Sequence, residues 1–333
     1  NKTFCIPFKT VTESDAGPPH ILEPSVLNGS KNFPVKSPFD ILSKGSLKTF
    51  LNAMTGSDIT LYPVSSMNDK DFRSLMHVYL DAVFNPLIYE DPRILEQEGW
   101  HHDLEHADSN LTYKGVVYNE MKGVFSNPTR ELGYLVDRQL FPDTPYRFLS
   151  GGYPAAIPTL TYDNFINFHR KYYHPSNSYI FLYGDGDTEA ELAFIDEHYL
   201  SKYTESDQIV DIPLQPAFEA LRSSQGFYSA IEGSELEGNS YLSLSFVVGL
   251  SADQQLVLGL RVLTQALFNN ESAPVRLALQ EAGIGKDISA WVDDLKQNVF
   301  HIQVQNANPD EGEKFKRVVF ETLEKVANEG LDT

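Results

Sequence analysis

The spacing of apolar residues alternates along the chain between the two-residue repeat of a strand and the helical repeat of about 3.6 residues. Residues 68–84 give the clearest helix, because their apolar side chains share one face. Similar spacing predicts helices over 20–27, 42–54, 115–125, 130–140 and 162–173. Short apolar runs predict strands over 4–9, 59–64 and 179–183, and we expect residues 99–106 to be extended.

The alternation begins again after a polar segment, 204–216, that is rich in Ser, Asp and Pro. It predicts strands over 241–248 and 299–304, and helices over 253–268, 274–282 and 311–328. Strands and helices in both halves predict an α+β fold of two related domains, each with helices packed on a mixed sheet. We place the first domain at 1–200, the linker at 201–225 and the second domain at 226–333. We expect the second domain to be truncated at its C-terminus.

Composition and charge narrow the choice of partners. The chain has 333 residues, 41% of them hydrophobic, and no apolar run of about 18 residues that would span a membrane. Its 46 acidic and 26 basic residues give a net charge of −20. Nucleic acid and anionic membrane surfaces need a basic patch, so we expect neither as a partner. The acidity favours positively charged peptides, and solubility alone explains it equally well.

The chain contains one cysteine, Cys5, so it has no internal disulfide. A single thiol is typical of a reducing compartment. We therefore expect the cytoplasm, or the mitochondrial matrix if the source is eukaryotic.

One short segment carries candidate chemistry, His20-Ile21-Leu22-Glu23-Pro24. On a helix, residues four apart lie one above the other, and the residue three along lies beside them. The inverted zinc-protease motif H-x-x-E-H uses this geometry to place two histidine ligands around a glutamate. Here the first histidine and the glutamate are present, but the fifth position is Pro24, which has no donor atom for a metal. His-x-x-Glu pairs also arise by chance in many helices.

An ordered series of further segments supports the interpretation of His20 and Glu23 as part of this motif. They lie at 8–10, 19–23, 27–30, 33–39, 50–55, 97–100, 113–123, 150–152 and 173–177. Together they resemble the opening of presequence proteases, a branch of the pitrilysin/insulinase family of metallopeptidases. The resemblance covers residues 4–185 strongly and is thin beyond, although 282–285 is also similar.

The resemblance implies a fold, a reaction and a site. The fold is the pitrilysin/insulinase-like (LuxS/metallohydrolase-like) half-chamber, and the reaction is hydrolysis of short unfolded peptides by zinc-activated water. His20 and Glu120 correspond to zinc ligands, and Glu23 to the general base. The missing ligand falls on Pro24. The substrate-binding edge strand falls on Asn52, Ala53, Met54 and Thr55, where a peptide would add as a strand. The family's C-terminal half would complete the chamber.

Pro24 leaves three interpretations open. The chain is a catalytically inactive pseudo-peptidase that serves as a peptide-binding or assembly module. Alternatively another residue supplies the ligand, with His101, His102 and His106 as candidates. The third interpretation is an introduced substitution or a sequence error. Inside a helix, proline also removes a backbone hydrogen bond at a cost of about 3 kcal/mol, and a kink there would move Glu23.

Glu98 is the other acidic residue of interest. It either supports the metal ligands from behind or forms a salt bridge at the end of a strand.

Overall fold

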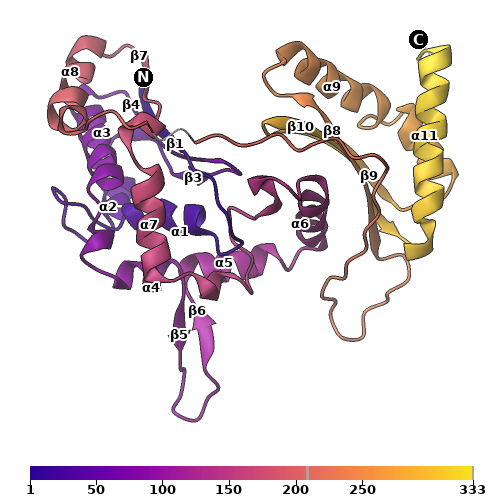
Figure 1. Cartoon of the computed structure of the whole chain (residues 1–333), viewed down its shortest axis with the longest axis horizontal. Helices are drawn as coiled ribbons and strands as arrows, with labels where there is room; N and C mark the ends of the chain where they lie inside the picture. The colour runs from indigo at the N-terminus through magenta and orange to yellow at the C-terminus, as the bar shows by residue number, and fades with distance from the viewer. Residues whose placement is uncertain (208–209, 332–333) are drawn as a thin grey trace. The chain divides into compact units, whose positions relative to one another are not determined.

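A computed structural model of the chain describes residues 1–207 and 210–331 (Figure 1). The chain divides into two compact units. The first unit comprises residues 1–124 and 148–211, and the second comprises 125–147 and 212–333. The predicted linker, 201–225, includes the point where the chain passes from one unit to the other, and its residues 208–209 lie outside the described residues.

A five-stranded sheet organises the first unit. Its strands are β1 (Lys2–Lys9), β2 (Lys48–Leu51), β3 (Met54–Thr55), β4 (Ile59–Ser66) and β7 (Phe181–Gly184). They lie in the order β2-β4-β1-β7, with β3 also paired to β4, and the pairings are antiparallel. Alternate residues of β1 are buried, so the strand turns Phe4, Ile6 and Phe8 toward the core.

Seven helices and a hairpin accompany this sheet among the described residues. The helices are α1 (Pro18–Val26), α2 (Pro38–Gly45), α3 (Asp69–Phe84), α4 (Arg93–Glu98), α5 (Val116–Val124), α7 (Tyr162–Tyr172) and α8 (Thr188–His198). The hairpin is β5 (His101–Asp103) with β6 (Thr112–Lys114), and short 3-10 turns lie at Leu87–Tyr89, Ile157–Thr159, Pro175–Asn177 and Leu200–Lys202. The helix predicted over 68–84 is confirmed as α3. Asn68 caps it by accepting a hydrogen bond from the Asp71 amide at 3.0 Å.

The helix predicted over 42–54 is wrong. Helix α2 ends at Gly45, and the chain then forms β2 and β3. The apolar residues at 47, 50, 51 and 54 fit a helical repeat, but the strand pairing of Lys48 with Ser66 and of Leu51 with Val64 places them on a sheet edge. Tertiary pairing overrides local spacing here.

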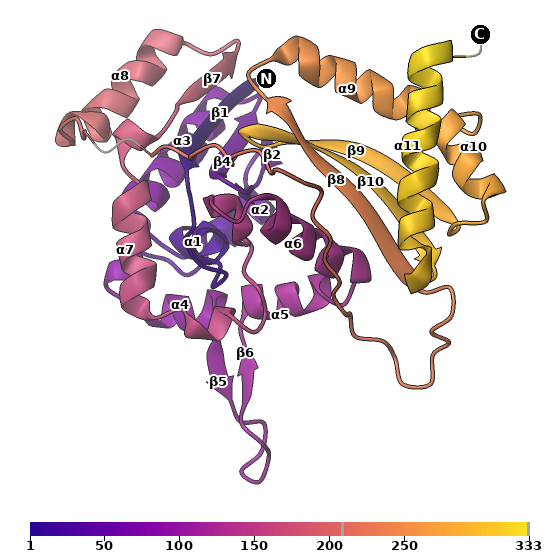
Figure 2. The same cartoon turned by 45° about the vertical axis from the view of Figure 1, so that its right-hand side comes forward.

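The second unit contains a three-stranded antiparallel sheet in the order β8-β10-β9. Its strands are β8 (Ser240–Leu250), β9 (Asp287–Asp294) and β10 (Gln297–Ala307). Its helices are α6 (Pro128–Leu140), α9 (Gln254–Leu267), α10 (Pro274–Glu281) and α11 (Gly312–Glu329), with 3-10 turns at Pro145–Arg147 and Pro309–Glu311. Helices α9, α10 and α11 lie on one face of the sheet, while α6 lies on the other (Figure 2).

Most of the second unit follows the predicted pattern. The helices and the strands predicted over 241–248 and 299–304 are present, but β9 was not predicted. Alternate residues Ile288 and Ala290 enter the apolar core with Leu244, Ile302 and others, whereas the opposite face of β9 carries Asp287, Ser289, Trp291 and Asp293. Across both units, the described helices include none long and apolar enough to span a membrane.

Candidate functional site

Helix α1 carries the candidate motif and is fixed at its start by two glycines. Gly17 caps the helix with a φ of 69°, in the left-handed region. A Cβ on Gly17 would lie 2.7 Å from the Cα of Gly152, so only glycine permits this close approach of the two chain segments. The helix then continues through Pro24 without interruption. The proline therefore does not end the helix.

His20 is held in one orientation by the 150–152 turn. Its Nδ1 lies 3.0 Å from the Gly151 carbonyl oxygen, which only an N–H can satisfy. In the neutral ring this places the proton on Nδ1 and leaves the lone pair on Nε2. Nε2 faces the Glu120 carboxylate of α5, with 3.7 Å between Nε2 and Oε2. A lone pair and a carboxylate repel each other unless a proton or a cation lies between them.

Helix α5 reaches this position because its start packs directly on the end of α4. Gly115 has a φ of 154°, and a Cβ there would lie 2.1 Å from the Gly99 carbonyl oxygen. The Tyr118 amide donates to that same oxygen at 3.3 Å. The contact between these two glycines therefore brings Glu120 to His20.

Glu23 lies beside His20 and is largely enclosed. Its Oε2 accepts a hydrogen bond of 2.7 Å from the Thr55 hydroxyl. Burial raises the pKa of Glu23, while the Thr55 hydroxyl and His20 oppose the rise and Glu120 adds to it. A carboxyl group with a raised pKa beside a histidine is typical of acid–base chemistry, although buried structural groups show the same shift.

The segment predicted to bind substrate forms the edge of the sheet next to Glu23. Met54 and Thr55 constitute β3, which pairs with β4. Its other edge has no strand partner within residues 1–207 and 210–331. The Asn52 carbonyl accepts a hydrogen bond from the Tyr79 hydroxyl at 3.2 Å, which fixes the segment to α3. Strand addition at this edge would place a peptide backbone beside Thr55, whose side chain contacts Glu23.

Glu98 contacts the end of α1 and not the histidine. Its Oε1 accepts from the Asn28 side-chain amide at 2.8 Å and from Gln97 at 2.7 Å. The same Asn28 nitrogen lies 3.1 Å from the Pro24 carbonyl oxygen. Glu98 is thus a buried acid next to position 24, joined to it through one amide.

The three candidate replacement ligands lie on or next to the β5–β6 hairpin. His101 Nδ1 is 2.7 Å from the Glu96 carbonyl oxygen, and the His102 ring packs on Trp100 and Tyr113. His106 lies in the turn of the hairpin. Within the described part of the chain, no three His, Cys, Asp or Glu residues are grouped closely enough to hold a metal ion. The hairpin histidines are therefore not brought to His20 and Glu120.

These contacts allow a direct test of whether zinc fits. A catalytic zinc keeps three protein ligands and an open position for water. His20 and Glu120 supply two donor groups on facing helices, while Pro24, one turn after His20, supplies only carbon atoms. The residues present do not fit a three-ligand zinc centre.

Two functional contacts were not predicted from the sequence. The Gly151 carbonyl orients His20, and the Thr55 hydroxyl binds Glu23. The 150–152 segment contributed only to the family resemblance, and Thr55 only to the expected substrate-binding edge strand. The contact of Gly151 with His20 has one signal in the sequence, which is glycine both at 17, before the helix, and at 152. Both positions need glycine because the two chain segments approach each other closely there.

Comparison with known proteins gives consistent relatives. A family model described as "Peptidase M16 inactive domain" matches residues 159–333. The chain is 49% identical to Protein HypA of Clostridium perfringens and 40% identical to Presequence protease 1, chloroplastic/mitochondrial, of Arabidopsis thaliana. Both alignments cover all of this chain, but only 34% and 31% of those relatives. The chain thus spans about a third of the length of these curated relatives.

Solved structures show the same fold at low sequence identity. Pitrilysin matches 99% of the chain with a TM-score of 0.66 at 17% identity, over 34% of its own length. A peptidase M16 inactive domain from Pseudomonas fluorescens matches 99% of the chain with a TM-score of 0.70 at 15% identity, over 75% of its own length. The predicted α+β, pitrilysin-like fold is confirmed.

Proposed function

This chain belongs to the M16 peptidase family, in its presequence protease branch, and on that premise we propose that it is a peptide-binding member whose hydrolytic site is disabled at Pro24. The observation that carries the proposal is the donor set. His20 and Glu120 face each other across 3.7 Å, and the position one helical turn after His20 is a proline. Two donors hold zinc far more weakly than three.

Peptide binding needs no metal and relies on groups that are intact. The free edge of β3 offers main-chain hydrogen bonds to an extended peptide, and the net charge of −20 favours basic ones. Short unfolded peptides are therefore the proposed ligand class. The relatives named for presequences suggest targeting peptides among them, and a reducing compartment such as the cytoplasm or an organelle matrix as the setting.

A second candidate function, retained metal-dependent hydrolysis, has one observation in its favour. Nε2 of His20 and Oε2 of Glu120 lie opposite each other at 3.7 Å, and when His20 is neutral a cation between them would stabilise this arrangement. Hydrolysis would need a third donor. It would also need the further length present in the relatives, which we propose completes the substrate chamber.

Zinc content decides between the two functions. After dialysis against trace zinc, we expect the unaltered chain to hold well under one zinc per chain by elemental analysis. Pro24→His should bring this to about one, because it restores the third donor. The matched control is Pro24→Ala, which removes the ring without adding a ligand and should bind no more zinc than the unaltered chain.

Near-stoichiometric zinc in the unaltered chain would overturn the proposal, because a substitute ligand must then exist. A failure of Pro24→His to bind zinc would also count against it, since Pro24 would not be the defect. Peptide binding, measured by calorimetry in zinc-free buffer, should be the same for the unaltered chain and for Pro24→Ala.

A further inference from the structure

Strand β7 forms the edge of the first unit's sheet opposite β2 and carries exposed aromatic side chains. It pairs with β1 alone among the described strands. Phe181 is 55% exposed and Tyr183 is 73% exposed, and their rings stack with centroids 6.4 Å apart. Tyr179, two residues before Phe181, is 81% exposed. Exposed aromatic residues gathered on a sheet edge are typical of a binding surface.

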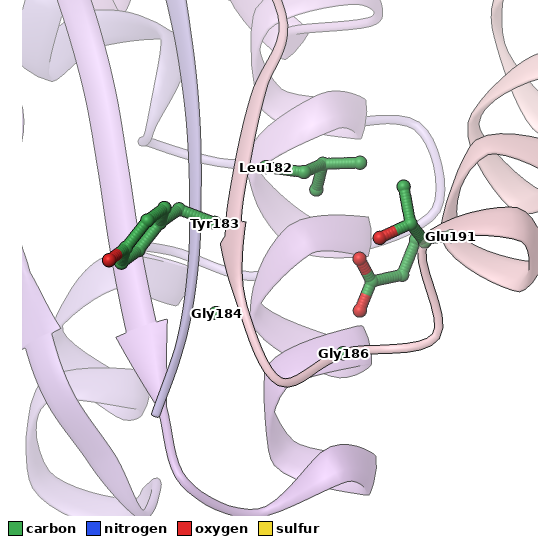
Figure 3. Close-up of a pocket in the computed structure, with 6 residues that line it drawn as sticks. Leu182, Tyr183, Gly184, Gly186 and Glu191 are labelled. Atoms are coloured by element: carbon green, nitrogen blue, oxygen red, sulfur yellow. The ribbon is translucent and has the colours of Figure 1, made fainter.

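The other side of β7 borders an open hollow of about 390 Å³ at the start of α8 (Figure 3). The hollow is lined by Leu182, Tyr183, Gly184, Gly186, Thr188 and Glu191. Leu182 and Glu191 point to the same side of the strand, while the Tyr183 ring points to the opposite side. The two sides of this edge therefore differ, with aromatic rings on one and a carboxylate on the other.

Glu191 is a buried acid on which two cations, Lys2 and Arg73, act without forming a direct ion pair. The residue is 8% exposed, and within the described part of the chain its carboxylate has no hydrogen-bond or ion-pair partner. Burial, and then the charge of Asp187, raise its pKa, while the charges of Lys2 and Arg73 oppose the rise. Of these two cations, Lys2 already pairs with Asp69 at 2.7 Å and with Asp185 at 3.6 Å. A Cβ on Gly186 would lie 2.2 Å from Oε1 of Glu191, so glycine at 186 is what lets the carboxylate pack against the chain at this point.

We propose that this edge binds an extended basic peptide, with a lysine or arginine side chain in the hollow against Glu191 and its neighbours on Phe181 and Tyr183. In an added strand, successive side chains point to opposite sides, which matches the two sides of β7. Charge favours this occupant over a second copy of the chain, because two chains of −20 repel each other. This inference rests on the proposed function, because each of the two proposals requires that the chain bind peptides. The edge is different, since β7 lies at the opposite edge of the sheet from β3.

The test uses a fluorescent acetylated peptide of about seven residues in which lysine alternates with valine or phenylalanine, alongside a copy with norleucine in place of lysine. Anisotropy gives both dissociation constants. Glu191→Gln should weaken binding of the lysine peptide about fivefold or more and leave the norleucine peptide unchanged. Tyr183→Ser should weaken both peptides about threefold. Tyr113→Ser, which removes another exposed tyrosine on the β5–β6 hairpin, is the matched control and should change neither.

Equal effects of Glu191→Gln on both peptides, or no effect, would overturn the inference. A misfolded variant does not block the test, because the unaltered chain must itself prefer lysine over norleucine, and must lose that preference in high salt.

Met54→Pro separates the two sites by blocking strand addition at β3. Binding kept in Met54→Pro and lost in Glu191→Gln supports the β7 edge. The reverse supports the proposed function and overturns this inference, as does self-association of the chain that Tyr183→Ser abolishes.

Discussion

Each unit contains a histidine that faces a carboxylate, and the two pairs differ in how completely they are bonded. In the first unit, Nε2 of His20 lies 3.7 Å from Glu120. In the second, Nε2 of His301 lies 3.1 Å from Asp293, Nδ1 lies 2.9 Å from the Ser245 hydroxyl, and the ring stacks on Trp291. The His301 ring is buried, whereas the Glu120 side chain is 56% exposed.

The difference shows that residue types alone do not identify a reactive site. Ser245, His301 and Asp293 have the composition of a hydrolytic triad, but they lie on three neighbouring strands whose register places them together. The Ser245–His301 hydrogen bond and the close approach of Asp293 to His301 connect the three strands on the sheet face that packs on α6. The His20 pair has an unused lone pair and an open neighbouring position, so it is the pair that a ligand could complete.

Replacing each histidine with alanine should give the largest effect, a difference between the two units in the loss of unfolding free energy. His301→Ala leaves Ser245 and Asp293 without their partner and creates a cavity beside Trp291, so we expect it to lower the free energy of unfolding of the second unit by about 2–4 kcal/mol. His20→Ala should cost the first unit less than about 1 kcal/mol. Urea denaturation followed by tryptophan fluorescence separates the units, because the chain's two tryptophans are Trp100 in the first and Trp291 in the second. Equal losses would show that the two pairs are alike.

Lowering the pH should destabilise the first unit through a different histidine, His169. Burial lowers the pKa of His169 to about 4, against a reference of 6.5, and its ring lies between the Val83 carbonyl and the Tyr89 hydroxyl. Between pH 6.5 and 4 the unfolded chain therefore binds a proton that the folded chain does not. Stability should fall by up to about 3 kcal/mol as the pH drops through this window. Trp100 fluorescence in urea at several pH values measures the slope, and His169→Gln should flatten it.

The second unit should show a smaller effect of opposite sign. Burial, and then the charge of Asp293, raise the pKa of Asp137 on α6 to about 7, against a reference of 3.8. The folded form therefore keeps this proton to higher pH, and stability should fall as the pH rises from about 4 to 7. Because Asp137 is only half-buried, we expect Asp137→Asn to add about 1 kcal/mol at pH 8 and little at pH 4. The exposed Asp287→Asn is the control, and an equal gain from it would refute the assignment.

Much of the fold follows from local pattern, and the failures have identifiable causes. Helix α3 was predicted from its apolar face, and the Asn68 cap seen in the structure agrees with the predicted start. The segment 42–54 was misread because Leu47, Phe50 and Leu51 satisfy a helical repeat by chance, and only pairing with β4 decides their conformation. Strand β9 was missed because its inward face offers few large apolar residues and ends at Asp294, while its outward face mixes Trp291 with polar residues such as Asp293.

The sequence predicts those contacts of the candidate site that join residues close together in the chain. His20 and Glu23 share one helix, so spacing alone sets them side by side. Glu120 came from family resemblance, because nothing local in α5 indicates that it faces His20. The bonds from Gly151 and Thr55 depend on chain segments 131 and 32 residues away from their partners, which no periodicity reveals.

Helix α6 is synthesised well before the strand on which it packs, and this delay determines the order in which the two units can fold. It packs on β8, yet β8 begins at Ser240, about 100 residues after α6 ends at Leu140. At a synthesis rate of about 5–20 residues per second, α6 leaves the ribosome roughly 5–20 s before its partner exists. The first unit's last segment, 148–211, is made in that interval. The first unit can therefore complete its fold before β8 is made, and the sheet of the second unit cannot form until β10, which ends at Ala307, has emerged.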